Sequence, residues 1–349
     1  MRQTSPAQAR TGYRRRRGIL ALLAALACLA GFAMAELKTS PSGTAASSGP
    51  ATSPSGMVTP GAGTAAPRRE RLAAVSWPAD GVSAADISGF GVVAGPGATR
   101  PVPIASVAKV MTADVVLHDN PLPGGGSGPD ILVQPSEAAE YPSQARDGDS
   151  LVPVAAGEAI TERQALEALL LPSADNMAWI LARWDAGSRA AFAARMNATA
   201  RRLGMSGTTY TDPSGLDPST TSTAADQVRL GMAAMRVPAL AAIVAKSAAV
   251  VPVAGVVRNY NTLLGQDGIA GLKTGSTQAA GGCVLIAAWH KAGAHNTLIV
   301  AATFGQPGTA QTILPTALRA GHMLVLALDR ALGHNARIGA PSQIPMTGP

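Results

Sequence analysis

A long stretch built almost entirely from Ser, Thr, Pro, Gly and Ala limits where this chain can fold. It runs from Thr39 to about Pro67 and shows no periodic spacing of apolar residues. Segments of this composition cannot bury enough apolar surface to offset the entropy lost on ordering, so they act as spacers. We therefore predict a disordered linker over residues 36–71, a folded domain over residues 72–335 and a tail over residues 336–349.

The residues before this linker resemble an export signal. Four arginines, Arg14 to Arg17, precede an uninterrupted run of apolar and small residues from Ile19 to Ala35, which ends in Ala33-Met34-Ala35. A basic start, an apolar core and a small-x-small ending are typical of a secretory signal peptide. The run is also just long enough to span a bilayer, so an uncleaved anchor is the alternative. We expect residues 1–35 to place the folded domain outside the cytoplasm, either secreted or held on the outer face of the membrane.

The formal charge of +7 comes almost entirely from this N-terminal segment. Six arginines and no acidic residue precede position 36, and the remainder carries 22 basic against 21 acidic residues. A nucleic-acid-binding protein normally keeps a basic face on its folded part, so we expect no nucleic-acid partner. The chain has two cysteines and no CxxC or His/Cys cluster, so no metal site and no organic cofactor is implied.

The apolar pattern predicts an α+β domain. Helical spacing is expected in five segments: 106–117, 162–171 (ended by Pro172), 176–184, 190–203 (stopped by Gly204) and 309–332, the last interrupted early by Pro315. Strand patterns are expected at 90–93, 282–290 and 297–304, the last two forming an antiparallel hairpin, and a Gly/Pro loop at 122–130. Strands thus lie near both ends of the domain and helices in its middle. This order is typical of an antiparallel sheet with a helical insertion.

Ser106 and Lys109 form the first candidate catalytic pair. Side chains three residues apart on a helix share a face, so the lysine amine can lie beside the hydroxyl. A serine hydroxyl is a weak nucleophile that needs an adjacent base, and a desolvated lysine can supply one. By itself this pair is more typical of a helix start with a capping serine and a solvated lysine.

Two further polar segments follow. Ser173, Asp175 and Asn176 lie between two predicted helices, where a loop can present a hydroxyl and an amide to a cleft, or where they simply cap a helix. Lys273, Thr274 and Gly275 precede a predicted strand, where a fixed cation and a hydroxyl could hold a substrate carboxylate. A glycine-rich turn with a solvated lysine is the alternative. The glycine spacing does not fit a phosphate-binding loop.

Taken in order, the three segments are Ser-x-x-Lys, Ser-x-polar and Lys-Thr-Gly, a set typical of penicillin-binding proteins and class A β-lactamases. The chain resembles the serine D-alanyl-D-alanine carboxypeptidases, the low-molecular-mass penicillin-binding proteins of peptidase family S11, over most of residues 75–305. The segments that carry the resemblance are 104–113, 208–217, 222–226, 259–264 and 271–277.

The resemblance implies a β-lactamase/transpeptidase-like fold and an acyl-enzyme mechanism on peptidoglycan stem peptides that end in D-Ala-D-Ala. Ser106 would be the nucleophile, Lys109 would take its proton, and Ser173 would relay a proton to the leaving amine. Lys273 and Thr274 would hold the terminal carboxylate, and β-lactam antibiotics would acylate Ser106. Gly275 would let the backbone of its strand approach the substrate.

One position departs from the family pattern of Ser-x-Asn, because this chain has Asp175 in place of the asparagine. An asparagine amide can donate a hydrogen bond to a substrate carbonyl, whereas an ionised carboxylate cannot. We expect an active but slower enzyme, unless Asn176 takes over through a one-residue shift. A β-lactamase, a D,D-endopeptidase and a weakly active penicillin-binding module that senses the wall are the alternatives.

Overall fold

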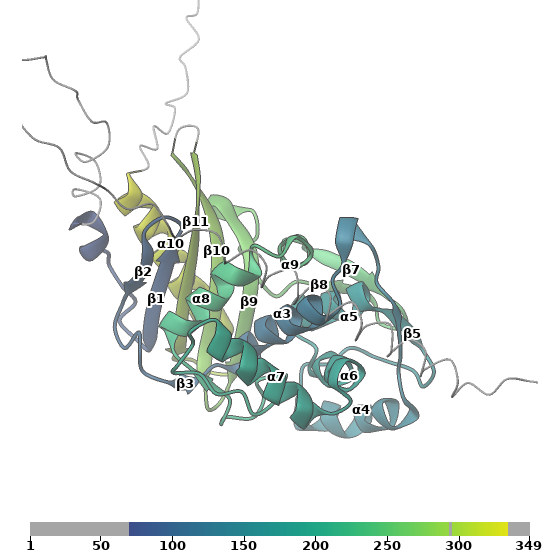
Figure 1. Ribbon diagram of the computed structural model, residues 1–349. Helices are drawn as coiled ribbons and strands as arrows, with labels where there is room; N and C mark the ends of the chain where they lie inside the picture. The colour runs from purple at the N-terminus through teal and green to yellow at the C-terminus, as the bar shows by residue number, and fades with distance from the viewer. Residues whose placement is uncertain (1–69, 293–294, 334–349) are drawn as a thin grey trace, which may run out of the picture. The chain divides into compact units, whose positions relative to one another are not determined.

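The computed structural model describes residues 70–292 and 295–333 (Figure 1). Its centre is a five-stranded antiparallel sheet with the strand order β2-β1-β11-β10-β9. The first two strands come from the start of the described chain and the other three from its end. The sequence predicted a sheet formed from both ends of the domain, although it did not predict β1. The strands are β1 (Val82–Ile87), β2 (Gly91–Ala94), β9 (Ile269–Thr277), β10 (Gly281–Ala292) and β11 (His295–Gln306).

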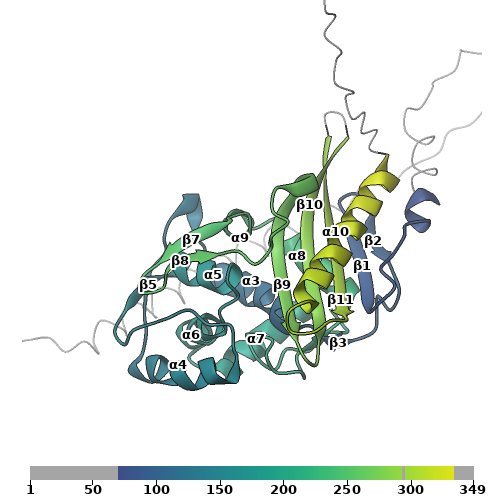
Figure 2. The same cartoon turned by 180° about the vertical axis from the view of Figure 1, so that it is seen from behind.

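Helices cover both faces of this sheet. Helix α10 (Ile313–Leu332) packs on one face and α8 (Ala224–Ala234) on the other, as Figures 1 and 2 show from opposite sides. Two glycines permit the close packing: a Cβ on Gly321 would meet Val284 at 2.7 Å, and one on Gly231 would meet Val300 at 2.6 Å. Because strand side chains alternate between faces, the central strands are apolar on both sides and separate two hydrophobic cores.

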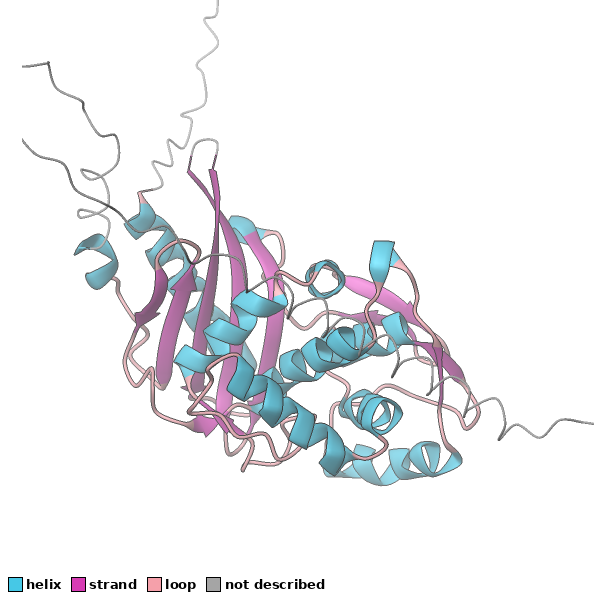
Figure 3. Cartoon of the chain, viewed as in Figure 1, coloured by secondary structure: helices cyan, strands magenta, loops and turns pink. Residues whose placement is uncertain are grey.

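The helical part is inserted between β2 and β9 (Figure 3). Its helices are α3 (Lys109–Asp119), α4 (Pro135–Asp147), α5 (Glu162–Leu170), α6 (Asp175–Ala186), α7 (Arg189–Arg202), α8 and α9 (Pro238–Val244). Three small antiparallel pairs complete it: β3 (Val102–Pro103) with β6 (Thr221–Ser222), β4 (Asp130–Leu132) with β5 (Ala159–Thr161), and β7 (Ala248–Val251) with β8 (Gly255–Arg258). The short 3-10 helices are η1 (Ala105–Ala108), η2 (Pro123–Gly125) and η3 (Gln266–Gly268). The predicted α+β class is therefore confirmed.

Local chemistry sets several helix ends where the sequence placed them. Thr161 caps α5 by accepting a hydrogen bond from the Gln164 N–H at 3.2 Å, and Pro172 follows the end of that helix. Ser188 caps α7, and Gly204 follows its end with a positive φ of 70°. The prediction that Pro315 interrupts the last helix was wrong. Helix α10 starts at Ile313, so Pro315 lies in its first turn, where the backbone N–H has no intrahelical partner.

Several elements were not predicted, notably β1, α4 and α8. The predicted loop at 122–130 contains η2 and reaches the first residue of β4. The predicted signal or anchor and the predicted tail lie outside the described residues, as does nearly all of the predicted linker; residues 70 and 71 belong to the first turn of a short helix. None of the described helices is by itself long and apolar enough to cross a membrane.

Candidate active site

The Ser106–Lys109 pair sits at the junction of a 3-10 helix and an α-helix. Ser106 belongs to η1, and Lys109 begins α3. Side chains at i and i+3 eclipse in a 3-10 helix, so the two side chains project together. The Lys109 Nζ lies 2.7 Å from the Ser106 Oγ. The sequence predicted one continuous α-helix from Ser106, and the tighter first turn is what aligns the pair.

Lys109 is fully buried and has three hydrogen-bond acceptors. Besides Ser106, its Nζ lies 2.6 Å from the Asp175 Oδ1 and 3.0 Å from the Ser214 carbonyl oxygen. An ammonium group has three N–H donors, and each finds one acceptor here. The same distances fit a neutral amine that donates to Asp175 and Ser214 and accepts the hydroxyl proton of Ser106. The geometry therefore accommodates both states of a proton transfer between Lys109 and Ser106.

The Ser214 carbonyl is positioned by a tight turn around Asp212. One carboxylate oxygen, Oδ2, accepts hydrogen bonds from the backbone N–H groups of Ser214 at 3.0 Å and Gly215 at 2.9 Å. A Cβ on Gly215 would stand 1.9 Å from the Ala105 carbonyl oxygen, so glycine is required where this turn meets η1. Thr112 ties α3 to the same turn through a 2.6 Å hydrogen bond to the Pro213 carbonyl. These residues belong to a segment that supported the family resemblance, but the carbonyl itself was not predicted as a site group.

The Ser173 segment crosses from α5 to α6. Ser173 is buried and has a left-handed φ of 67°, an uncommon conformation for a residue other than glycine. Asp175 is the first residue of α6, and its backbone N–H donates to the Ser150 carbonyl at 2.7 Å. Its Oδ2 accepts from the Ser150 N–H at 3.0 Å. Both carboxylate oxygens are therefore engaged, one with Lys109 and one with the 150 loop.

Asn176 does not replace the missing asparagine. Its amide Nδ2 donates to the Val152 carbonyl at 2.8 Å, and its Oδ1 accepts from the Val152 N–H at 3.3 Å. Both ends of the side chain hold the loop that precedes β5, because a one-residue step on a helix turns a side chain by about 100°. Asp175, and not Asn176, occupies the position next to Lys109.

Strand β9 brings the third segment to the same place. Lys273 and Thr274 are buried, and the Lys273 Nζ donates to the Thr274 carbonyl at 2.8 Å. Burial, together with the neighbouring charge of Lys109, lowers the pKa of Lys273 well below its usual value, and Asp175 partly opposes this shift. A Cβ on Gly275 would stand 2.9 Å from the Ser106 backbone nitrogen. Gly275 therefore lets the edge strand of the sheet reach the backbone of the serine.

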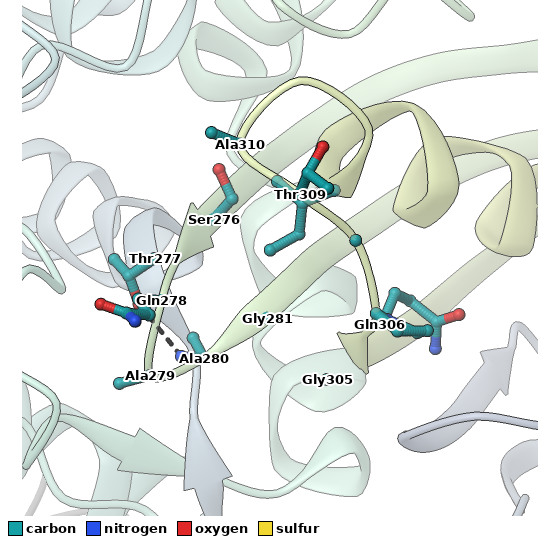
Figure 4. A pocket seen from close by; sticks show the side chains of 13 residues that line it. Ser276, Thr277, Gln278, Ala279, Ala280, Gly281, Gly305, Gln306, Thr309 and Ala310 are labelled. Carbon is teal, nitrogen blue, oxygen red and sulfur yellow. Dashed lines mark hydrogen bonds between the residues drawn. The ribbon is translucent and has the colours of Figure 1, made fainter.

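A hollow of about 910 Å³ adjoins the end of β9 (Figure 4). Ser276 and Thr277 form one side of it, and Thr309 and Ala310 face them from the loop between β11 and α10. Gln306, the last residue of β11, also lines it. All of the lining residues are uncharged. An extended ligand lying along β9 would find room here for an uncharged group.

Among the described residues, Lys109 thus directly contacts both Ser106 and Asp175, and Gly275 lies next to the Ser106 backbone. The charges of Lys109 and Asp175 also act on the buried Lys273. Within residues 70–292 and 295–333, no group of three or more His, Cys, Asp or Glu side chains is placed to hold a metal ion. Ser106, Lys109 and Lys273 together can catalyse acyl transfer. The hydroxyl supplies the nucleophile, and the two buried amines, one of them with a lowered pKa, can exchange protons with it.

A model of the peptidase S11 family, D-alanyl-D-alanine carboxypeptidase, matches residues 84–305. The chain belongs to this family. Among curated proteins, it is 38% identical over 139 residues to a D-alanyl-D-alanine endopeptidase of Pseudomonas aeruginosa, an alignment that covers 40% of this chain and 42% of the relative. It is 40% identical over 136 residues to a D-alanyl-D-alanine carboxypeptidase of Mycobacterium tuberculosis, covering 37% and 46%. The alignments thus span just under half the length of these two relatives.

Solved structures support the fold assignment. The Streptomyces K15 DD-transpeptidase superimposes with a TM-score of 0.62 at 23% identity, covering 73% of this chain and 99% of that one. At this level of identity the likeness concerns the fold alone. It confirms the predicted β-lactamase/transpeptidase-like architecture, and the family assignment confirms the resemblance seen in the sequence.

Proposed function

We propose that this chain is a serine D-alanyl-D-alanine carboxypeptidase that trims peptidoglycan stem peptides and binds penicillin. The observation that carries the proposal is the 2.7 Å contact between the Ser106 Oγ and the buried Lys109 Nζ, beside a strand that carries Lys-Thr-Gly. Family membership and the names of the relatives agree with it.

The proposed reaction has two steps. The Ser106 Oγ attacks the carbonyl carbon between the two D-alanines while its proton passes to neutral Lys109, and the C–N bond then breaks. The departing D-alanine amine receives a proton through Ser173. Water next attacks the Ser106 ester, which releases the shortened peptide and restores the hydroxyl. The Ser106 backbone N–H, which lies next to Gly275 of β9, would stabilise the oxyanion.

Strand β9 would bind the substrate. It is the edge strand of the sheet, so an extended peptide can pair with its free side as an added strand. In this pose Lys273 and Thr274 would hold the terminal carboxylate. Binding of an anion would favour the charged form of Lys273, whose pKa is lowered in the free protein.

We further propose that the enzyme works outside the cytoplasm. The basic and apolar pattern of residues 14–35 supports export, with the chain either released or held on the outer face of the membrane. Peptidoglycan, the proposed substrate, lies on that side. Mass spectrometry of the chain's N-terminus in the membrane and medium fractions would distinguish cleavage after Ala35 from an intact anchor.

The intact mass after incubation with benzylpenicillin tests the catalytic proposal. We expect a stoichiometric adduct on the parent and none on Ser106→Ala. An unmodified parent in the presence of consumed penicillin would indicate a β-lactamase instead. An unmodified parent with intact penicillin would refute acylation of Ser106.

A D,D-endopeptidase is the second candidate, because the P. aeruginosa relative and an Escherichia coli relative both bear that name. Both activities break a peptide bond that follows a D-alanine carbonyl. They differ in whether the amine that leaves belongs to free D-alanine or to a second peptide. Chromatography of products from a pentapeptide and from a cross-linked peptide dimer separates them. Release of D-alanine alone would support the carboxypeptidase.

A further inference from the structure

The outer side of α10 lies between two hollows. The larger, of about 700 Å³, separates the first turns of α10 from the loop that follows β8, and the smaller, of about 330 Å³, separates α10 from residues 76–79. Both hollows share Arg319, so they form one continuous surface, called here the α10 face. Its apolar floor is formed mainly by Leu263, Leu314, Pro315, Leu318, Ala320 and Leu324.

The charges on this face are basic and unbalanced. Arg258 and Arg319 form no ion pair with any other residue of the described chain, and both are exposed. His322 is paired with Asp267: its Nε2 lies 2.7 Å from the Asp267 Oδ2. No carboxylate lines either hollow. Unpaired guanidinium groups around an apolar floor are complementary to a ligand that combines an anionic head with hydrocarbon.

Large side chains of intermediate polarity surround these arginines. Met323 is 54% exposed and Tyr260 is 44% exposed, and Trp77 lines the smaller hollow. Tyrosine and tryptophan concentrate at the boundary between lipid and water, where an apolar ring and a polar edge are both satisfied. The residues of α10 that line the two hollows lie on one side of the helix, and Met323 is the exposed large apolar side chain among them.

We propose that the α10 face binds the surface of a membrane that contains anionic phospholipid. The hollows receive hydrocarbon near the head groups, and Arg258 and Arg319 contact lipid phosphates. The chain's own remaining segments do not fit this role, because residues 1–69 contain a single acidic residue, Glu36, and residues 334–349 contain none. The occupant must therefore bring its negative charge from outside the chain.

Docking through this face leaves the candidate active site free. Helix α10 covers the sheet face opposite to α8, whereas Ser106 lies on the helical side, next to Gly275. A protein held in this way keeps Ser106 accessible to substrate above the lipid. The proposal does not use the chemistry of Ser106, so it stands or falls separately from the proposed peptidase activity.

Amide hydrogen exchange of the full chain tests the proposal at the residues concerned. The full chain is mixed with vesicles of phosphatidylcholine, with or without phosphatidylglycerol, and exchange is followed in peptides covering 258–263 and 313–323. We expect exchange there to slow several-fold only when phosphatidylglycerol is present, and high salt to reverse the effect. Because the readout is local, attachment through the apolar run at 19–35 does not imitate it.

The double variant Arg258→Gln/Arg319→Gln should lose this protection. Each basic residue near an anionic surface adds roughly fivefold to binding, so the pair accounts for about 30-fold. The matched control is Arg201→Gln/Arg236→Gln, which removes the same charge and should keep the protection. Both residues are exposed; Arg201 lies on α7, and Arg236 lies just after the end of α8. Circular dichroism and thermal unfolding report whether both variants are folded, independently of the proposed peptidase activity.

Three results would overturn the proposal. One is equal protection on vesicles of phosphatidylcholine alone, and another is protection that survives in Arg258→Gln/Arg319→Gln. The third is protection without vesicles that grows with protein concentration, because it would assign the face to a second copy of the chain.

Discussion

Asp175 occupies the position where the family pattern has asparagine, and we expect this aspartate to slow acylation. The variant Asp175→Asn should restore the faster rate. In the structure the Asp175 carboxylate lies 2.6 Å from the Lys109 Nζ, and both side chains are at most 1% exposed. The proposed first step needs a neutral Lys109 amine that can accept the Ser106 proton. A carboxylate at this distance stabilises the ammonium form, which cannot accept it.

The size of the effect follows from the contact that is lost. A hydrogen bond between charged groups contributes about 1.5–3 kcal/mol more than no bond, and about 1.4 kcal/mol corresponds to a factor of ten in rate. Asp175→Asn should therefore raise the acylation rate by about 10- to 100-fold near neutral pH. The new amide could also donate to a substrate carbonyl, which adds to the gain.

The assay is stopped-flow acylation by benzylpenicillin, with Asp149→Asn as the matched control. Asp149 precedes Ser150 and is only partly buried. Its charge acts on Lys109 and Asp175 at longer range, without a hydrogen bond or ion pair to Lys109, so its neutralisation should change the rate less than about threefold. An equal or slower rate for Asp175→Asn would refute the argument that the carboxylate holds Lys109 in an unproductive state. Urea unfolding supplies a second readout. A loss of about 3–5 kcal/mol would indicate that Lys109 stays charged without its partner.

Three further predictions rest on other groups. Burial, with the nearby charge of Asp185, raises the pKa of Glu162 to about 7. The folded state therefore binds this proton more tightly than the unfolded chain, so the free energy of unfolding falls as pH rises from 4.5 to 7. Glu162→Gln should match the parent near pH 4 and exceed it by about 1–2 kcal/mol at pH 8 in urea unfolding. The pKa of Lys273 is lowered in the folded state, so the unfolded chain binds this proton more tightly. The free energy of unfolding of the parent should therefore rise by about 1.4 kcal/mol per pH unit between the lowered pKa and 10.5. Lys273→Met should lack this rise. Gly275→Ala places a methyl 2.9 Å from the Ser106 nitrogen and should cut penicillin acylation at least tenfold, with circular dichroism unchanged.

The elements that sequence predicts well are those with one clear pattern. The hairpin of β10 and β11 and helices α5, α6 and α7 were predicted to within two residues at every end. Caps and breakers such as Thr161, Pro172 and Gly204 mark the helix ends. Strand β1 was missed because it is buried on both faces, so Val82–Ile87 shows no alternation. Helix α4 was missed because it is polar and contains Pro142.

The site shows the same division. Side chains that belong to motifs, such as Ser106, Lys109 and Lys273, could be predicted from the sequence and lie together. The Ser214 carbonyl and the Ser150 N–H could not, because a backbone group is brought to a site by the turn that carries it and leaves no signature in residue type. Only the run Asp212-Pro213-Ser214-Gly215, typical of a tight turn, gave a signal there.

The structure also changes how the Asp175 substitution is to be understood. Two buried amines, Lys109 and Lys273, share one carboxylate, and that carboxylate contacts Lys109 directly. Within the described part of the chain, the Lys273 Nζ donates a hydrogen bond only to the Thr274 carbonyl, and burial together with the charge of Lys109 lowers its pKa. A substrate carboxylate would favour the charged form of Lys273, whose pKa is lowered in the free protein, so substrate binding and proton uptake should be coupled. With Asp175 replaced by Asn, Lys109 loses its counter-charge, and a substrate carboxylate would be the first anion to enter. The two forms should therefore differ in the pH dependence of substrate binding as well as in the rate of acylation.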